Sequence, residues 1–259
     1  MPAPDLTPLS LPPVERPIHV HLHARFVSPE TLAGSVVVVI DNLRASVTMT
    51  AALARGATLV LPTLTVEDAI QHRDRASAEG KPLPLLGGER GGVLIPGFDL
   101  DNSPRAYTKE RVEGREVVFT TANGTAALLQ SRLAARVIVG SFVNLSRVVL
   151  ALHDDPRPVH LLCCGSRDDV GLDDILPAGA MVERLISLGR SLTHDDSARL
   201  ALLAWHACKG DLDAAMESSR GGRGLARLGL ADDIRACSAI DSLPVLPVYA
   251  GGVVRLAND

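Results

Sequence analysis

The amino-acid sequence predicts an α/β fold in which a mostly parallel or mixed sheet is flanked by helices. Short runs of β-branched residues alternate with helical patterns from Val36 onward, and this alternation is typical of right-handed βαβ units. The run Val36–Ile40 is apolar at every position, as in strands that are buried on both faces of a parallel sheet. We find no internal repeat and no interdomain linker. We therefore expect a single domain over residues 18–259, preceded by a Pro-rich arm over residues 1–17.

Several segments are predicted strands because each is short, apolar or β-branched, and bounded by turn residues or helical patterns. They are residues 35–40, 57–62, 82–86, 116–120, 136–140, 159–163 and 243–250. Prolines flank the last of them, which follows a long helical region.

Helical patterns separate the predicted strands. The Ala/Leu-rich segment after the first strand ends at Gly56, a residue typical of the position just past a helix. Thr65, with Asp68 three residues later, and Ser103-Pro104 have the signatures of helix starts. The predicted helices are residues 45–56, 65–79, 125–134 and 144–153, and the pattern is again helical from the acidic loop at 168–174 to about residue 219. Glycine-rich loops are predicted at residues 87–97 and 218–224.

Composition and charge argue against several classes of protein. A formal charge of -4 and few aromatic residues leave no basic, base-stacking surface for nucleic acid. The longest aliphatic stretch is far shorter than the roughly 20 residues of a membrane helix, and the first residues lack the apolar core of a signal peptide. The four cysteines lack CxxC spacing, so we expect reduced thiols, neither a disulfide nor a zinc framework, and a cytoplasmic protein.

Polar residues follow the predicted strands at the positions where ligands bind in open α/β sheets, beyond the carboxyl ends of the strands. Asp41 and Arg44 follow the first strand, and Glu89-Arg90 lie between glycines after the third. The segment Thr121–Thr125 opens a helix, where hydroxyls and free amides favour a phosphate or sulfonate. The alternative is a plain Asn-Gly turn with a helix cap.

Carboxylates gather in the same part of the sequence. Asp41 suits a metal ligand or a nucleophile, with the cap of the helix at Ala45 as the alternative interpretation. Glu89 suits a metal ligand, and the adjacent Arg90 suits an anion-binding group. The alternative interpretation is a surface ion pair. Asp99 and the segment before Ser103-Pro104 add further carboxylates. Such oxygens near a phosphate are what Mg²⁺ selects.

Three other features are left open. Cys163-Cys164 lack the arginine six positions on that a cysteine phosphatase requires, so packing is the favoured interpretation. His19, His21 and His23 alternate along one strand face, as in a metal site or, more commonly, a solvated edge. The segment 218–224, SSRGGRG, is either an anion-binding lid or a plain surface loop.

Taken in order, these motifs resemble one family, the 2-phosphosulfolactate phosphatases. The segments that carry the resemblance are VVVVIDNLRAS, GGERGG, GFDLDNSP, TTANGTAAL, VGSFVN, CCG, LDDILPAGA and SRGGRGLARLGLADDI. The resemblance extends from about Val36 to Asp241. The sequence departs from the family pattern at Asn42, Asp101, Ala122 and Asp173, which bears on the identity of the substrate more than on the fold.

The resemblance implies a three-layer α/β/α fold and a Mg²⁺-dependent phosphatase that converts (R)-2-phospho-3-sulfolactate to 3-sulfolactate and phosphate, a step of coenzyme M biosynthesis. The catalytic residues it implies are Asp41, Glu89 and Arg44. The substrate-binding residues it implies are Arg90, Asn102, Ser103, Thr121, Asn123, Gly124, Thr125 and Ser141. The metal ligands it implies are Asp41, Glu89, Asp99 and Asp174.

We therefore expect a metal-assisted hydrolase of a small phosphate ester that carries a second anion, with neither nucleic acid nor membrane as a partner. A homodimer is plausible, since most soluble oligomers are homodimers. The alternatives are a phosphotransferase or isomerase of small hydroxy-acid or sugar phosphates, and a non-catalytic sensor of small anions.

Overall fold

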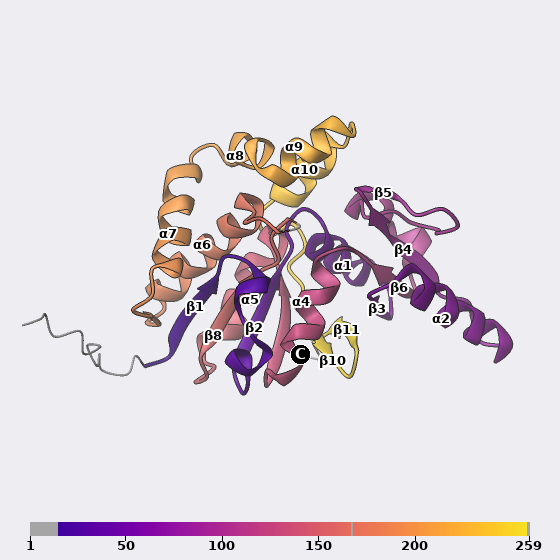
Figure 1. Cartoon of the computed structure of the whole chain (residues 1–259), viewed down its shortest axis with the longest axis horizontal. Helices are drawn as coiled ribbons and strands as arrows, with labels where there is room; N and C mark the ends of the chain where they lie inside the picture. Colours follow the sequence, from indigo (N-terminus) through magenta and orange to yellow (C-terminus); the bar gives the residue numbers. More distant parts are fainter. Residues whose placement is uncertain (1–14, 167, 258–259) are drawn as a thin grey trace, which may run out of the picture.

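A mixed sheet with helices on both faces forms the centre of the molecule (Figure 1). The structure is a computed structural model and describes residues 15–166 and 168–257. Within these residues the sheet has 11 strands, in the order β5-β4-β6-β3-β11-β10-β7-β2-β8-β1-β9. The predicted α/β class is confirmed. Most of the predicted Pro-rich arm lies outside the described residues, and Pro17 already belongs to the first strand.

The strands are β1 (Pro17–His21), β2 (Val36–Ile40), β3 (Leu59–Thr63), β4 (Leu85–Arg90), β5 (Val93–Leu94), β6 (Glu116–Thr120), β7 (Arg136–Gly140), β8 (Val159–Cys163), β9 (Ser191–Leu192), β10 (Pro247–Ala250) and β11 (Val253–Leu256). The α-helices are α1 (Ala45–Ala54), α2 (Val66–Ala78), α3 (Lys109–Val112), α4 (Gly124–Gln130), α5 (Leu145–His153), α6 (Leu172–Ser187), α7 (Ser197–Cys208), α8 (Leu212–Ser218), α9 (Arg220–Arg227) and α10 (Ala231–Ser238). Short 3₁₀ turns connect several of them, including Pro104–Ala106 after the predicted helix start at Ser103.

The sheet consists of two parallel blocks joined by a hairpin. Strands β4, β6 and β3 form one block, and β7, β2, β8, β1 and β9 form the other. Between them lie β10 and β11, joined by Gly251-Gly252 with positive φ at both residues, as a tight hairpin turn requires. The hairpin pairs antiparallel with β7 on one side and with β3 on the other.

The two blocks run in opposite senses, because three antiparallel pairings in succession separate them. The residues that follow β2 and β6 are nevertheless in contact: a Cβ atom on Gly124 would lie 3.0 Å from the Asp41 carboxylate. At the hairpin, β11 is registered with β3 at a single pair, Val254 and Val60. The segments that follow β2 and β6 therefore meet although their strands belong to different blocks.

Helices cover β2 on both of its faces, which explains why every residue of that strand is buried. Val36, Val38 and Ile40 pack with side chains of α5 and α6 on one face. Val37 and Val39 pack with side chains of α1 and α4 on the other. A strand with apolar side chains on both faces is stable in water only if both faces are covered. The helices on the two sides of β2 cover them and give the expected three-layer arrangement.

Two local expectations were wrong. The segment 218–224, predicted as a loop because of its glycines, belongs largely to helix α9. Gly87 and Gly88, predicted in a loop, belong to strand β4. The strand β11 was not predicted at all. Among the described residues, no helix combines the length and the apolar content that crossing a bilayer requires.

Candidate active site

A cavity of about 680 Å³ lies beyond the ends of β2, β4 and β6. One part of its lining, here called the strand-end wall, comes from residues at or just after the ends of these strands and from the loop before Ser103: Asp41, Glu89, Asn102, Thr121, Ala122 and Asn123. Another part, here called the α9 wall, comes from one helix: Arg220, Gly221, Arg223, Gly224, Leu225 and Arg227. Figure 1 shows α9 and α10 together above the central strands.

Asp41 is held at the end of β2 with 8 % of its surface exposed. Its Oδ1 accepts the backbone N–H of Ala45 at 3.3 Å, so it does satisfy the first turn of α1, and its own N–H donates to Ser46 Oγ. Burial, together with the nearby carboxylates of Asp173 and Glu89, raises the pKa of Asp41 to about 7. A neighbouring cation would therefore stabilise the ionised form of this buried carboxyl group.

Glu89 reaches the cavity because of an unusually close approach of β4 to β6. Gly88 has φ +135°, and a Cβ atom there would lie 2.0 Å from the carbonyl oxygen of Thr120, so only glycine fits. The Glu89 carboxylate accepts the N–H of Gly92 at 2.7 Å and that of Ala122 at 3.4 Å. These two amides fix the carboxylate between the loop that follows β4 and the loop that follows β6.

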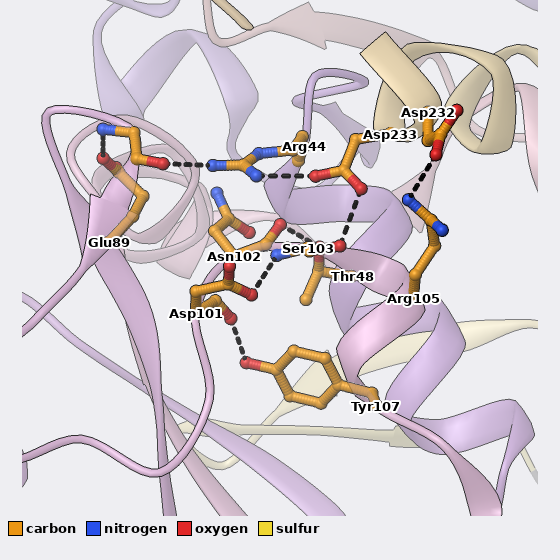
Figure 2. A network of polar contacts seen from close by, with 11 residues as sticks. Arg44, Thr48, Glu89, Asp101, Asn102, Ser103, Arg105, Tyr107, Asp232 and Asp233 are labelled. Carbon is orange, nitrogen blue, oxygen red and sulfur yellow. Dashed lines mark hydrogen bonds and ion pairs between the residues drawn. The ribbon is translucent and has the colours of Figure 1, made fainter. Parts of the chain in front are cut away.

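Arg44 lies at the centre of a buried polar network (Figure 2). Its guanidinium donates to Asp233 Oδ2 at 2.7 Å and to the carbonyl oxygen of Gly92 at 2.9 Å. Ser103 Oγ donates to the other Asp233 oxygen at 2.7 Å. Arg44 and Asp233 are 2 % and 1 % exposed. Because Asp233 balances its charge, Arg44 connects the strand ends to α10 and acts as a positioning residue.

Two side-chain oxygens of the strand-end wall are buried without a hydrogen-bond partner. Asn102 Oδ1 and Thr121 Oγ1 belong to residues that line the cavity, and neither oxygen has a partner among the described residues. Thr125 Oγ1, in the first turn of α4, is in the same condition. Leaving a buried polar atom unsatisfied costs about 1–3 kcal/mol. Such atoms indicate a place where a bound ligand completes the hydrogen bonding.

Four other expected site residues are engaged elsewhere. Asp99 accepts the N–H of Leu86 at 2.8 Å, at the opposite end of β4 from Glu89. Both oxygens of Asp174 are taken by the N–H groups of Asn42 and Gly165. The remaining two are Arg90, which donates to Thr120 Oγ1 and the Leu64 carbonyl, and Ser141, which caps a short turn through Asn144. The structure does not bring these four side chains to the lining of the cavity.

Other expected residues do meet at the cavity or border it. Asn123 lines it and donates to the carbonyl oxygen of Gly165 at 3.2 Å. Gly124 borders Asp41 and leaves no room for a side chain. The departure at Asn42 has a structural role, since its side chain joins the N–H of Phe142 to the carbonyl oxygen of Cys237.

The arginines of α9 are the site residues that sequence reasoning assigned least securely. Arg220 and Arg223 lie in the segment 218–224, which was interpreted as either an anion-binding lid or a plain surface loop, and Arg227 was not singled out. The signal that could have decided is the spacing of Arg220, Arg223 and Arg227, which puts all three on one face of a helix.

The strand-end wall offers an oxygen-only set of donors. It contains the carboxylates of Asp41 and Glu89 and the unpaired oxygens of Asn102 and Thr121. Among the described residues, no group of three His, Cys, Asp or Glu side chains is arranged around a common metal position. Mg²⁺ is commonly held by only one or two carboxylates, with substrate phosphate and water as the other ligands. The residues present therefore fit Mg²⁺ better than a metal that needs a complete protein cage.

The histidines form a separate cluster. His21 Nε2 and His160 Nδ1 are hydrogen-bonded at 2.8 Å, and His19 stacks on His160. These rings lie on β1 and β8 and do not line the cavity. The four cysteines are free thiols, of which Cys163 and Cys164 are buried in the core.

Comparison with known proteins identifies the family. A family described as 2-phosphosulpholactate phosphatase matches residues 23–252. A protein of Symbiobacterium thermophilum is 41 % identical over 228 residues, covering 88 % of this chain and 96 % of that protein. A protein of Deinococcus radiodurans is 39 % identical over 226 residues, covering 86 % and 91 %. Both are named probable 2-phosphosulfolactate phosphatase. The chain belongs to the 2-phosphosulfolactate phosphatase family, and it is a phosphoric monoester hydrolase.

Proposed function

We propose that this phosphatase hydrolyses 2-phosphosulfolactate to 3-sulfolactate and phosphate, with Mg²⁺ bound at the strand-end wall. The observation that carries the proposal is the lining of one cavity, which combines the carboxylates of Asp41 and Glu89 with a row of arginines from α9. A substrate with a phosphate and a second strong acid fits this division of charge. The names of the relatives point to the same substrate.

The carboxylates of the strand-end wall support a divalent cation. Glu89 and Asp173 lie close enough to Asp41 for their negative charges to disfavour its ionised form. A cation between them removes this cost. When bound, Mg²⁺ would shield the charge of the phosphoryl oxygens. Asp41, Glu89 and Asn102 Oδ1 are the groups that we expect to hold it.

The remaining residues of the strand-end wall bind and orient the phosphate. Thr121 Oγ1 has a free hydroxyl proton for a phosphoryl oxygen, since it has no other partner among the described residues. Arg44 keeps Gly92 in place, and Gly92 in turn fixes the Glu89 carboxylate. We therefore expect substitution at Arg44 to disturb Glu89 before it affects contact with the substrate.

Phosphate release from three substrates tests this proposal. The substrates are 2-phosphosulfolactate, phospholactate and an aryl phosphate, each with Mg²⁺ and with EDTA. We expect metal-dependent hydrolysis that favours 2-phosphosulfolactate. Equal rates in EDTA would contradict the role of the metal. Release from none of them would contradict the proposed reaction and favour a phosphotransferase or isomerase of small phosphates, or a non-catalytic anion sensor.

A further inference from the structure

The α9 wall presents a row of positive charge to the cavity. Arg220, Arg223 and Arg227 are spaced by three and four residues, so their side chains leave α9 on one face. All three line the cavity. The strand-end wall opposes them with the carboxylates of Asp41 and Glu89. The two walls therefore have opposite charge.

The three arginines differ in how far they are already engaged. Arg220 forms an ion pair with Asp169 in the acidic loop. Arg223 donates to the carbonyl oxygen of Ser218, a neutral partner that leaves its charge unbalanced. Arg227 makes neither a hydrogen bond nor an ion pair within the described residues. Arg44, the other guanidinium of the lining, is neutralised by Asp233. Arg223 and Arg227 are thus the cations that remain available to a ligand.

The position of α9 is fixed by close packing at its first turn. The N–H of Gly221 lies 3.4 Å from Asp173 Oδ1, and a Cβ atom on Gly221 would lie 2.5 Å from the other oxygen of that carboxylate. A Cβ atom on Gly222 would lie 2.0 Å from the carbonyl oxygen of Met216. Two consecutive glycines therefore let the helix dock tightly on α6 and α8. This docking holds the arginine face toward the cavity.

Space for a ligand group lies beside the arginines. Gly224 also lines the cavity, and a Cβ atom built on it would have nothing within 4 Å. Gly224 directly follows Arg223 and lies three residues before Arg227. The missing side chain leaves open space on the cavity side of α9, next to the positions of Arg223 and Arg227.

We propose that Arg223 and Arg227 bind the second anion of the substrate, the sulfonate, while the phosphoryl group lies against the strand-end wall. This inference rests on the proposed function and assigns the residues that determine its specificity. Planar guanidinium groups suit a tetrahedral oxyanion because each offers several N–H donors in a fixed geometry. Mg²⁺ bound at the strand-end wall would attract the more highly charged phosphoryl group, which leaves the singly charged sulfonate to the arginines and sets the orientation of the substrate.

Calorimetric titration with 3-sulfolactate in the presence of Mg²⁺ tests the assignment, because no bond is broken and turnover is not needed. The variants are Arg223→Gln and Arg227→Gln, which keep a polar side chain and remove the charge. Arg199→Gln is the matched control, since Arg199 is an exposed arginine of α7 that pairs with Asp196 and does not line the cavity. Lactate, which lacks the sulfonate, is the ligand control.

We expect each α9 variant to weaken binding of 3-sulfolactate by about 10- to 100-fold, the value of one charge-assisted hydrogen bond. Arg199→Gln should bind like the wild type, and lactate should bind all four proteins alike. Wild-type affinity in both α9 variants, or no binding of 3-sulfolactate by the wild type, would overturn the assignment. Thermal unfolding confirms that each variant is folded; both substituted arginines are exposed. Failure of the phosphate-release assay alone would refute the proposed reaction and leave this binding result intact.

Discussion

The two walls of the cavity are built in different ways. The strand-end wall collects residues from three separate strand ends, and its key groups, such as Asp41 and Thr121, are almost completely buried. The α9 wall is a single helix of eight residues, whose arginines are exposed and whose Gly222 and Leu225 are buried. The first is held by the sheet and by hydrogen bonds to backbone amides, and the second by packing at one helix end.

This difference suggests a division of roles. Groups that hold a metal and a reacting phosphate need fixed geometry, which rigid strand ends provide. Groups that recognise a second anion need charge and reach, which arginines on a surface helix provide. Substitutions in the first wall should therefore abolish turnover, and substitutions in the second should change selectivity.

The largest expected effect is that of Asp41→Asn. Loss of this carboxylate should lower kcat by about 10²- to 10⁴-fold, because a charged group directed at the reacting phosphate is removed. The protein should remain folded, since a buried acid with a raised pKa is not a source of stability at neutral pH. Phosphate release at saturating Mg²⁺ and thermal unfolding measure both quantities.

Asp99→Asn is the comparison for that variant. Its carboxylate accepts the N–H of Leu86 at the far end of β4, so we expect its kcat to stay near the wild-type value. A loss as large as that of Asp41→Asn would return Asp99 to the metal site that the family resemblance implied.

The Arg44–Asp233 pair tests how the strand-end wall is attached to α10. Arg44→Met leaves the Asp233 carboxylate buried without its cation, and we expect the free energy of unfolding to fall by about 3–5 kcal/mol. Arg105→Met is the matched control: Arg105 pairs with the neighbouring Asp232 at the surface, and its loss should cost at most about 1 kcal/mol. Equal losses by chemical denaturation would contradict the positioning role of Arg44.

The buried histidines predict a pH dependence of stability that is independent of both walls. Burial, together with the neighbouring histidines, lowers the pKa of His21 to about 4 and that of His160 to about 3. In the unfolded chain these histidines have pKa values near 6.5, so between about pH 6.5 and 4 they bind protons that they do not bind in the folded protein. Stability should therefore fall as the pH drops from about 6.5 toward 4, by about 1–3 kcal/mol. The slope should be smaller in His160→Gln, and an unchanged slope in denaturation at several pH values would disprove the assignment.

The smallest change in stability, and the most specific test of the α9 wall, is expected for Gly224→Leu. Leucine favours a helix over glycine by about 0.5–1 kcal/mol, so the melting temperature should rise slightly. The new side chain would project into the cavity, because nothing lies within 4 Å of its Cβ position. We expect kcat/KM for 2-phosphosulfolactate to fall by about tenfold. A normal kcat/KM in the folded variant would mean that substrate does not use this part of the cavity.

Most of the fold is readable from the sequence because it depends on local patterns. An all-apolar run such as Val36–Ile40 can only be an internal strand, and Thr65 does cap α2 through the N–H of Asp68, as predicted. The insertion of the β10–β11 hairpin between two parallel blocks depends on pairing between distant segments, which no local pattern encodes. Helix α9 was missed for a related reason, since its glycines serve tertiary packing on Asp173 and Met216.

The sequence predicts the part of the site that consists of residues at the ends of strands. Asp41, Thr121 and Asn123 follow strands and Glu89 lies near the end of one, and the structure brings them to one cavity although β2 runs opposite to β4 and β6. Asp99 was grouped with them because it is close to Asn102 in sequence, but its carboxylate is used at the other end of β4. The partner of Arg44 lies in α10, far along the chain, so the sequence could not reveal that its charge is already balanced.

The selectivity ratio, kcat/KM for 2-phosphosulfolactate divided by kcat/KM for an aryl phosphate, tests the division of roles most directly. It should be measured for the wild type, Glu89→Gln and Arg227→Gln. We predict that Glu89→Gln lowers both rate constants and leaves the ratio unchanged, whereas Arg227→Gln lowers only that for 2-phosphosulfolactate and reduces the ratio by about 10- to 100-fold. Equal losses on both substrates in Arg227→Gln would contradict the account.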